Sequence, residues 1–420
     1  MRNFLLTILI LTPFFVCSDA NNQQNLQDTL LDNTEEDILK DIKEIDINEI
    51  LDKSYNIPEE DILTDIPTED LKDVLSTDTA DDIIHMDTST SDTYIDIQDI
   101  NPFDYEPIDI SPDAHTETGI SDINNGSGLY KSDSDPYSKG RLPVKKMSVV
   151  KGQNGSPVEA SIYLPQGYKE FAVVIFQHGF LVDNNFYSDM LEHIASHGFV
   201  VVAPQMYKAD GIPIGKPKSS EEAETAIQFY NWLKLNINNL TGVNARMDLL
   251  GLSGHSRGGK VIWTIMLKDP SWTKAIAGVD PVDGTGGPLG GETRIADKPF
   301  NLNVSSLIIG TGLGPQGSGL NQACAPEGDN HVQFYNASSS PAYHAVAIDY
   351  GHMDMLNDST PGCGMVCAAC KSGPDRKGMR IFTAAQLTAF FRYILQNDNS
   401  MLNILIDPSK ANIKVIMENK

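Results

Sequence analysis

The sequence predicts an α/β fold with a mostly parallel central sheet and helices on both faces. Residues 172–176 and 199–203 are uninterrupted apolar runs, which are typical of strands that are covered on both faces. Segments with helical periodicity, such as residues 221–235, separate such runs, and this alternation indicates a parallel sheet. A third observation is a strand, a tight turn and a helix around Ser256.

The charge of the chain is concentrated in its N-terminal third. The 420 residues carry a formal net charge of −26, and residues 18–140 alone hold 33 Asp and Glu against six Lys. The remainder is nearly neutral and is long enough to bury one large core. Because it shows no basic cluster, we expect no nucleic-acid binding. No feature of the sequence predicts an oligomeric state.

Residues 1–20 resemble a secretory signal peptide. Arg2 precedes the apolar residues 4–11, which are too few to span a bilayer, and cleavage after Ala20 would suit signal peptidase. Cys17 offers a second interpretation, lipid attachment as in a bacterial lipoprotein. We therefore expect a secreted or cell-surface protein, with membrane or surface attachment through the N-terminal region left open.

Residues 21–140 read as an acidic, low-complexity, disordered tail. Asp-Ile pairs recur along it, and isolated isoleucines among like charges cannot bury enough surface to offset chain entropy. A calcium-binding or partner-binding segment is the alternative, but no stretch has the complete calcium loop with its distal glutamate.

Residues 141–420 read as one folded domain. The expected strands are residues 158–165, 172–176, 199–204, 248–253, 275–280, 305–309 and 344–349, and the expected helices are residues 185–197, 221–235, 261–267 and 384–396. Residues 402–417 show no informative pattern.

The turn after the strand at 248–253 has the pattern Gly254-x-Ser256-x-Gly258. This pattern is typical of a nucleophile elbow, in which a strained turn lifts the serine hydroxyl out of the sheet and flanking side chains would collide with neighbouring elements. A serine that merely caps a helix is the alternative. With its flanking strand and helix, the pattern predicts the α/β-hydrolase fold with Ser256 as nucleophile.

A serine nucleophile needs a histidine base and an acid that orients the histidine. Along an α/β-hydrolase chain the order is serine, then the acid, then the histidine. Asp280 ends an apolar strand and is the expected acid, with Asp283 as the alternative. His352 lies just past the last strand, after a glycine, and is the expected base. Asp349 and Asp354 are expected to be local partners of the His352 loop.

The oxyanion of the reaction needs two backbone N–H donors. We expect one from Arg257, which follows the nucleophile, and one from Phe180, with Leu181 as second choice. The side chains of Leu181, Val182 and Phe186 are expected to make an apolar substrate pocket.

Four motifs in order resemble the chlorophyllase family of α/β-hydrolases. They are GHSRGG at 254–259, VDPVDG at 279–284, CAPEGDNH at 324–331 and DYGHMDML at 349–356. The resemblance implies a carboxylic ester hydrolase with Ser256, Asp280 and His352 as its triad. The chain is similar, more distantly, to the lipase, cutinase and platelet-activating-factor acetylhydrolase group.

Four cysteines follow Cys17 in the chain: Cys324, Cys363, Cys367 and Cys370. In an exported protein this even number predicts two disulfides, with three connectivities open. A zinc site built from the four thiolates is the alternative.

The sequence therefore favours an exported serine esterase that acts on a small hydrophobic ester and needs no cofactor or metal. A true chlorophyllase, which releases phytol from chlorophyll, is a second hypothesis. A non-catalytic surface-binding protein on the same fold is a third.

Overall fold

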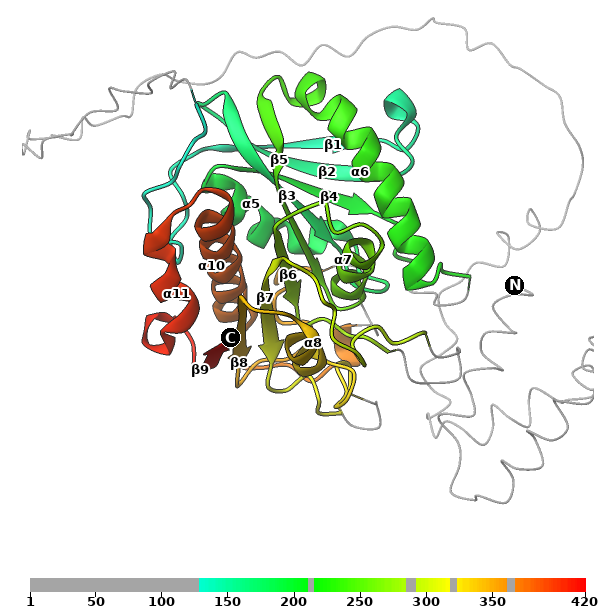
Figure 1. Cartoon of the computed structure of the whole chain (residues 1–420), viewed down its shortest axis with the longest axis vertical. Coiled ribbons are helices and arrows are strands. Elements are labelled where there is room, and N and C mark those ends of the chain that lie inside the picture. The colour runs from blue at the N-terminus through cyan, green and yellow to red at the C-terminus, as the bar shows by residue number, and fades with distance from the viewer. Residues whose placement is uncertain (1–127, 211–214, 285–291, 318–322, 361–366) are drawn as a thin grey trace, which may run out of the picture. The chain divides into compact units, whose positions relative to one another are not determined.

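A computed structural model describes residues 128–210, 215–284, 292–317, 323–360 and 367–420 (Figure 1). The predicted signal peptide, residue Cys17 and nearly all of the predicted acidic tail lie outside the described residues. None of the helices in the described part of the chain has the length and hydropathy needed to span a bilayer.

Strands and helices alternate along the chain. The strands are β1 (Val144–Val149), β2 (Glu159–Pro165), β3 (Glu170–Gln177), β4 (Phe199–Gln205), β5 (Asn244–His255), β6 (Ala275–Val279), β7 (Ser305–Thr311), β8 (Ala342–Ala347) and β9 (Val415–Asn419). The helices are α5 (Ser188–Ser196), α6 (Ser219–Thr241), α7 (Arg257–Lys268), α8 (His331–Ala337), α10 (Arg376–Leu395) and α11 (Leu402–Ile406), with short 3-10 turns that include η3 (Asn184–Tyr187).

The described strands form one sheet in the order β1-β2-β4-β3-β5-β6-β7-β8-β9. The six strands from β4 to β8 in this order are parallel, whereas β1, β2 and β9 pair antiparallel to their neighbours. The predicted mostly parallel sheet of an α/β-hydrolase is thereby confirmed. The carboxyl ends of its parallel strands lie at one edge, and the loops that follow these strands gather there.

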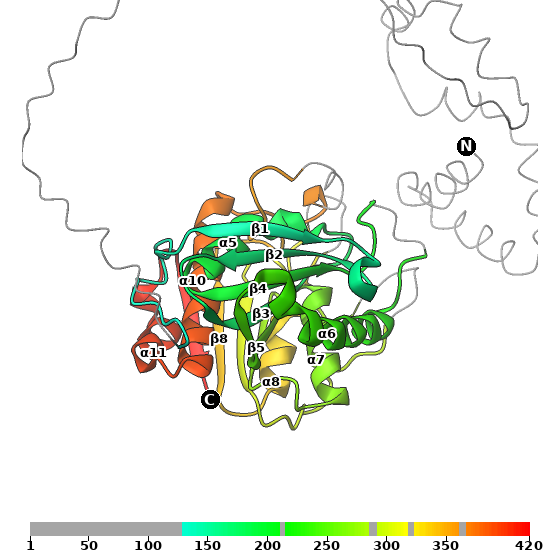
Figure 2. The ribbon, with the colours of Figure 1, turned by 90° about the horizontal axis from the view of Figure 1, so that it is seen from above.

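Helices cover both faces of the sheet, as Figure 2 shows, with α5 and α10 on one face and α6, α7 and α8 on the other. Each face has its own hydrophobic core. In β3 the residues alternate between the two cores: Ala172, Val174 and Phe176 pack in the core with α5 and α10, whereas Phe171, Val173 and Ile175 pack with α6 and α7. The apolar run of this strand follows from burial on both faces, since successive side chains point to opposite sides.

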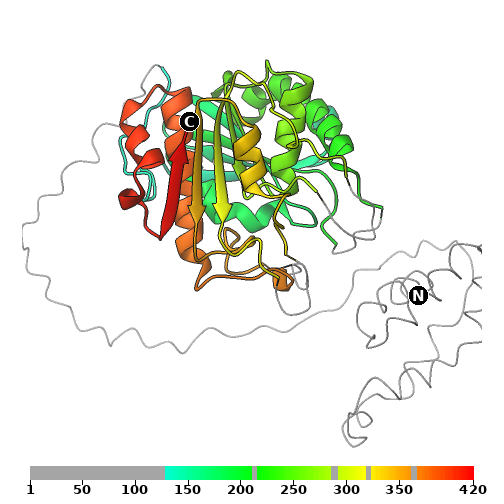
Figure 3. The same cartoon turned by 60° about the horizontal axis from the view of Figure 1, so that its bottom comes forward.

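Strands β1 and β9 and helices α8 and α11 were not indicated by the sequence pattern. Strands β1 and β9 are the exposed edges of the sheet and lack an apolar run, and β9 lies antiparallel beside β8 (Figure 3). Helix α8 begins at His331, within a segment for which the sequence pattern predicted neither a strand nor a helix. Its capping residue Asn330 accepts a hydrogen bond from the N–H of Val332 at 3.0 Å.

The packed region begins before Arg141, where the sequence placed the domain boundary. Tyr130 is buried, its N–H donates to the carbonyl of Glu170 at 3.0 Å, and its ring lies 4.5 Å from that of Tyr168. The buried Arg392 donates to the carbonyl of Ser134 at 2.6 Å. These contacts join the segment before Arg141 to the rest of the domain, so the expected boundary is too late.

Candidate active site

Ser256 lies in the turn between β5 and α7 with φ of 54° and ψ of −123°. A positive φ is unusual for serine and is the strained backbone expected of a nucleophile elbow. A side chain at Gly254 would collide with the backbone of Gly258, and one at Gly258 with the backbone of Gln177. Both glycines of the pattern are therefore required by close approach of the backbone.

Ser256, His352 and Asp280 form one chain of hydrogen bonds at the carboxyl ends of the parallel strands. His352 Nε2 lies 2.9 Å from Ser256 Oγ, and His352 Nδ1 lies 2.6 Å from Asp280 Oδ2. The ionised carboxylate can only accept, so Nδ1 carries the proton and Nε2 presents its lone pair to the serine hydroxyl. The arrangement can take a proton from Ser256.

Asp280 is fully buried and directly follows β6. Its two carboxylate oxygens also accept hydrogen bonds from the N–H of Thr311 at 3.0 Å and from the Thr311 hydroxyl at 2.7 Å. Burial acts to raise the pKa of Asp280, but the hydrogen bonds from His352 and Thr311, with the His352 charge, outweigh burial and hold the pKa below its ordinary value. Asp280 therefore remains ionised beside the imidazole.

Asp283, the alternative acid, points elsewhere. Its carboxylate accepts from the N–H groups of Ile295 and Ala296 at 2.8 and 2.7 Å, and it lies 3.4 Å from the ammonium of the buried Lys260. It thus fastens the returning loop to α7, and the structure brings Asp280, and not Asp283, to His352.

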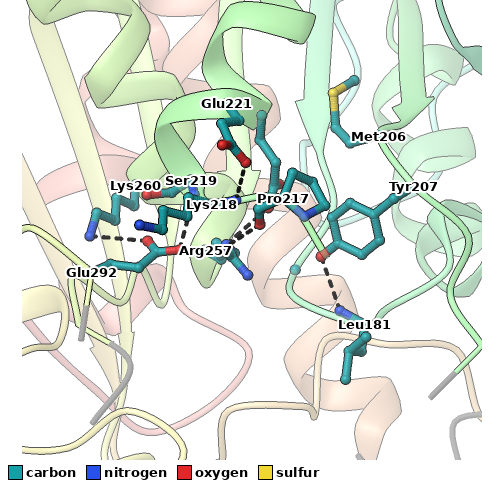
Figure 4. Close-up of polar contacts among 12 residues, drawn as sticks. Leu181, Met206, Tyr207, Pro217, Lys218, Ser219, Glu221, Arg257, Lys260 and Glu292 are labelled. Carbon is teal, nitrogen blue, oxygen red and sulfur yellow. Dashed lines mark hydrogen bonds and ion pairs between the residues drawn. The ribbon is translucent and has the colours of Figure 1, made fainter. Parts of the chain in front are cut away.

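The two expected oxyanion donors come from the loop after β3 and from the first residue of α7. Leu181, the second choice, has its N–H bonded to the hydroxyl of Tyr207 at 3.2 Å (Figure 4). That N–H is already used, whereas no hydrogen bond from the Phe180 N–H falls within the described ranges. This difference favours Phe180 over Leu181.

The side chain of Arg257 is held by two carboxylates that sequence reasoning missed. Its guanidinium pairs with Glu292 and donates to the carbonyl of Pro217 at 2.9 Å (Figure 4). It also pairs with Glu222 at 2.9 Å and lies 4.4 Å from the centre of the Phe180 ring. Arg257 therefore contacts the residue that carries the other expected donor. Glu222 follows another glutamate in the first turn of α6, where acidic residues are common, so the sequence held no signal for its role.

The environments of these two carboxylates differ. Burial raises the pKa of Glu222 to about 8, although the charge of Arg257 opposes it. Burial also acts to raise the pKa of Glu292, but the hydrogen bond from Ser219 and the charges of Arg257 and Lys260 outweigh burial and lower it. Glu292 is thus the firmly ionised partner of Arg257 at neutral pH.

A cavity of about 540 Å³ opens beside Ser256. Its lining within the described part of the chain is mainly apolar and includes Phe180, Val182, Val282, Pro326, Met353 and the cysteines 324 and 370. Val182 was expected there. Leu181 and Phe186 were also expected, but they do not line it: Leu181 is buried with φ of 58°, and Phe186 packs against the hydrophobic core.

A disulfide between Cys324 and Cys370, whose Cα atoms are 5.5 Å apart, forms part of the cavity wall. This confirms the disulfide interpretation for these two cysteines over a zinc site. Cys367 is also disulfide-bonded, and Cys363 lies outside the described residues. No group of metal-binding side chains is found in the part of the chain that the structure describes.

The disulfide lies next to the segment that supports His352. Lys371, which follows Cys370, packs so closely on Gly351 that a side chain at Gly351 would collide with its carbonyl. Asp354 Oδ2 accepts from the N–H groups of Gly351 and Gly373 at 2.6 and 2.7 Å. Asp354 is thus a local partner of the His352 loop, as expected from its position.

We predict that none of the four cysteines after Cys17 is free, and that reduction impairs the enzyme. Opening the Cys324–Cys370 link, which closes a loop of 46 residues, should lower the free energy of unfolding by about 4 kcal/mol on the loop-entropy account. Turnover should fall because the His352 loop loses its support. Thiol titration of the denatured, unreduced protein and activity before and after reduction check this. Four free thiols, or one bound zinc per chain, would contradict it.

A nucleophile elbow on a mostly parallel sheet, with serine, histidine and aspartate in hydrogen-bond contact, defines an α/β-hydrolase. The chlorophyllase family model matches residues 132–419. The chain belongs to the chlorophyllase family, and it is a hydrolase that acts on carboxylic ester bonds.

Curated relatives from plants are similar over about two thirds of the chain. Chlorophyllase-1 of Arabidopsis thaliana is 38% identical over 294 residues, which cover 66% of this chain and 89% of the relative. Chlorophyllase-2 of the same plant is 32% identical and covers 69% and 93%, and the chloroplastic chlorophyllase-1 of Citrus sinensis is 34% identical and covers 66% and 86%.

Proposed function

We propose that this protein is an exported serine esterase that cleaves hydrophobic carboxylic esters through Ser256, His352 and Asp280. The observation that carries the proposal is the unbroken chain of hydrogen bonds from Ser256 Oγ through His352 to Asp280. A binding protein would have no need of all three groups in this order, and the mainly apolar cavity beside Ser256 suits a hydrophobic ester.

The mechanism follows from the proton positions. Ser256 Oγ attacks the ester carbonyl while His352 Nε2 takes its proton, and Asp280 stabilises the imidazolium that forms. The N–H groups of Phe180 and Arg257 bind the oxyanion of the tetrahedral intermediate. His352 then returns the proton to the departing alkoxide, which leaves as the alcohol. Water, activated by His352 in turn, attacks the acyl-enzyme and releases the acid.

Chlorophyll is the second candidate substrate. The curated relatives are named chlorophyllases, and the chain covers most of the length of each. The bond cleaved in chlorophyll would be its phytyl ester, which the same three residues would hydrolyse.

A panel of esters tests both candidates. Hydrolysis should be measured with p-nitrophenyl esters of increasing acyl length, with esters of increasing alcohol length and with chlorophyll. A separate sample should be treated with a fluorophosphonate, which labels a catalytic serine covalently and should block this hydrolysis. Labelling together with ester hydrolysis supports the esterase, and release of chlorophyllide selects the chlorophyllase. Failure to label and to hydrolyse any of these esters would favour the non-catalytic alternative.

We further propose that residues 1–20 direct export, that the acidic tail ends before residue 128, and that the tail has no part in catalysis. Its role would be spacing from a membrane or attachment to a surface.

A pair of truncations tests the boundary. A protein that starts at Gly128 should keep the kcat/KM of the full chain on a soluble ester. One that starts at Arg141 should lose on the order of 3 kcal/mol of stability, since it lacks the buried Tyr130 and leaves Arg392 without the Ser134 carbonyl. A tenfold loss of kcat/KM in the protein that starts at Gly128, relative to the full chain and at both low and high salt, would contradict the proposal. A loss at low salt alone would indicate electrostatic steering by the tail.

A further inference from the structure

A buried chain of hydrogen bonds joins three loops around the candidate site. The N–H of Gly179 donates to the hydroxyl oxygen of Tyr187 at 3.0 Å, this hydroxyl lies 2.7 Å from His255 Nδ1, and His255 Nε2 lies 2.8 Å from the carbonyl oxygen of His352. Tyr187 and His255 are fully buried. We call this chain the Tyr187–His255 relay.

The chemistry of the partners determines where the protons lie. A carbonyl oxygen only accepts, so His255 Nε2 carries a hydrogen. Burial, assisted by the charge of His352, lowers the pKa of His255 to about 3, so the ring is neutral and its Nδ1 accepts. The Tyr187 hydroxyl must then donate to Nδ1, and its oxygen accepts from Gly179. Each hydrogen bond in the relay therefore has only one possible donor and one possible acceptor.

The relay leaves little room for movement. A Cβ added at Gly179 would lie 2.8 Å from His255 Nδ1 and 3.2 Å from the Tyr187 hydroxyl. The His255 ring lies 4.6 Å from the His352 ring. A neutral His255 at this distance avoids repulsion of the imidazolium that forms on His352 during the reaction.

We propose that Tyr187 and His255 are positioning residues that hold the oxyanion donor Phe180 and the general base His352 at the correct positions relative to each other. Gly179 immediately precedes Phe180, so the relay holds the residue from which the peptide that carries the Phe180 N–H extends. The same relay holds the backbone of His352. Donor and base come from loops far apart in the sequence, and an error of about 1 Å in such an arrangement can cost about 100-fold in rate. This inference rests on the proposed function.

The test is Tyr187→Phe, which keeps the ring and removes the hydroxyl. We expect kcat to fall about 10- to 100-fold, less than or comparable to the loss of one oxyanion donor, with KM changed less than about twofold. The inhibition constant of a trifluoromethyl ketone, whose adduct carries an oxyanion, should rise by the same factor as kcat falls. A merely structural role would lower the melting temperature without this selective effect.

Matched variants separate the relay from general effects of a buried hydroxyl. Tyr163→Phe is the control, because Tyr163 is also buried and its hydroxyl has no hydrogen-bond partner within the described ranges. It should keep the kcat of the unmodified protein. His255→Asn retains a polar group near the Nδ1 position and His255→Gln near the Nε2 position. Each loses one link, and each should lower kcat.

The outcomes are distinct. Unchanged kcat in folded Tyr187→Phe, with Ser256→Ala inactive, overturns the relay and leaves the esterase mechanism standing. An equal loss of kcat in Tyr163→Phe also overturns the relay. Unchanged turnover in Ser256→Ala overturns the esterase mechanism, and the relay with it.

Discussion

Replacing Ser256 with alanine should abolish ester hydrolysis and leave the fold intact. The substitution removes the hydroxyl that lies 2.9 Å from His352 Nε2, and no other group of the proposed mechanism can form the acyl-enzyme. By analogy with other serine hydrolases, kcat should fall by about 10⁶-fold. Both residues carry a Cβ, so the strain at the positive φ of this position changes little. Turnover of a soluble ester and the melting temperature measure the two effects.

Ser253→Ala is the matched control for this prediction. Ser253 lies on β5, three residues before the nucleophile; it is fully buried, and its hydroxyl has no hydrogen-bond partner in the part of the chain that the structure describes. Its removal should leave kcat unchanged. Comparable losses in the two variants, or residual turnover of more than about one per cent in Ser256→Ala, would reject Ser256 as the nucleophile.

Asp280→Asn should lower kcat by about 10³-fold or more with little loss of stability. An asparagine amide can present an N–H to His352 Nδ1, which would place the proton on Nε2 and remove the base from Ser256. Thr311 still donates to the side-chain oxygen, so packing is largely retained. Steady-state kinetics on a soluble ester measures the loss.

Asp283→Asn should show the opposite pattern. This change removes the buried charge beside Lys260 and weakens the bonds to the N–H groups of Ile295 and Ala296, so the free energy of unfolding should fall by about 2–4 kcal/mol. The effect on kcat should be far smaller than that of Asp280→Asn. Equal small losses of kcat in both variants would refute the assignment of Asp280 as the acid.

The sheet was predictable because its inner strands carry their own pattern. Residues 172–176 and 199–203 are apolar on both sides, and this follows directly from burial between two layers of helices. The edge strands β1 and β9 have half-exposed, mixed sequences and depend on pairing with β2 and β8. Local pattern could not reveal them, because their stabilisation comes from a distant partner strand.

The candidate site divides in the same way. The elbow glycines, the strand end before Asp280 and the strand before His352 are local features, so the sequence predicted all three residues of the hydrogen-bonded chain. It offered Phe180, with Leu181 as second choice, for one oxyanion donor. The contact that favours Phe180 is the hydrogen bond from the Leu181 N–H to Tyr207, which lies 26 residues from Leu181. The pocket prediction was partly wrong for a related reason: adjacent residues of a loop point in different directions once its backbone conformation is set.

The sequence by itself determined the fold class, the order of serine, aspartate and histidine, and the set of cysteines available for disulfides. Tertiary structure decided which residues meet: Cys324 with Cys370, Arg257 with Glu222 and Glu292, and Tyr187 with His255. It also showed that the segment from Leu129 packs on the domain. Local propensity follows from neighbours along the chain, whereas each of these contacts joins residues more than 30 positions apart and exists only after the sheet has brought its loops to one edge.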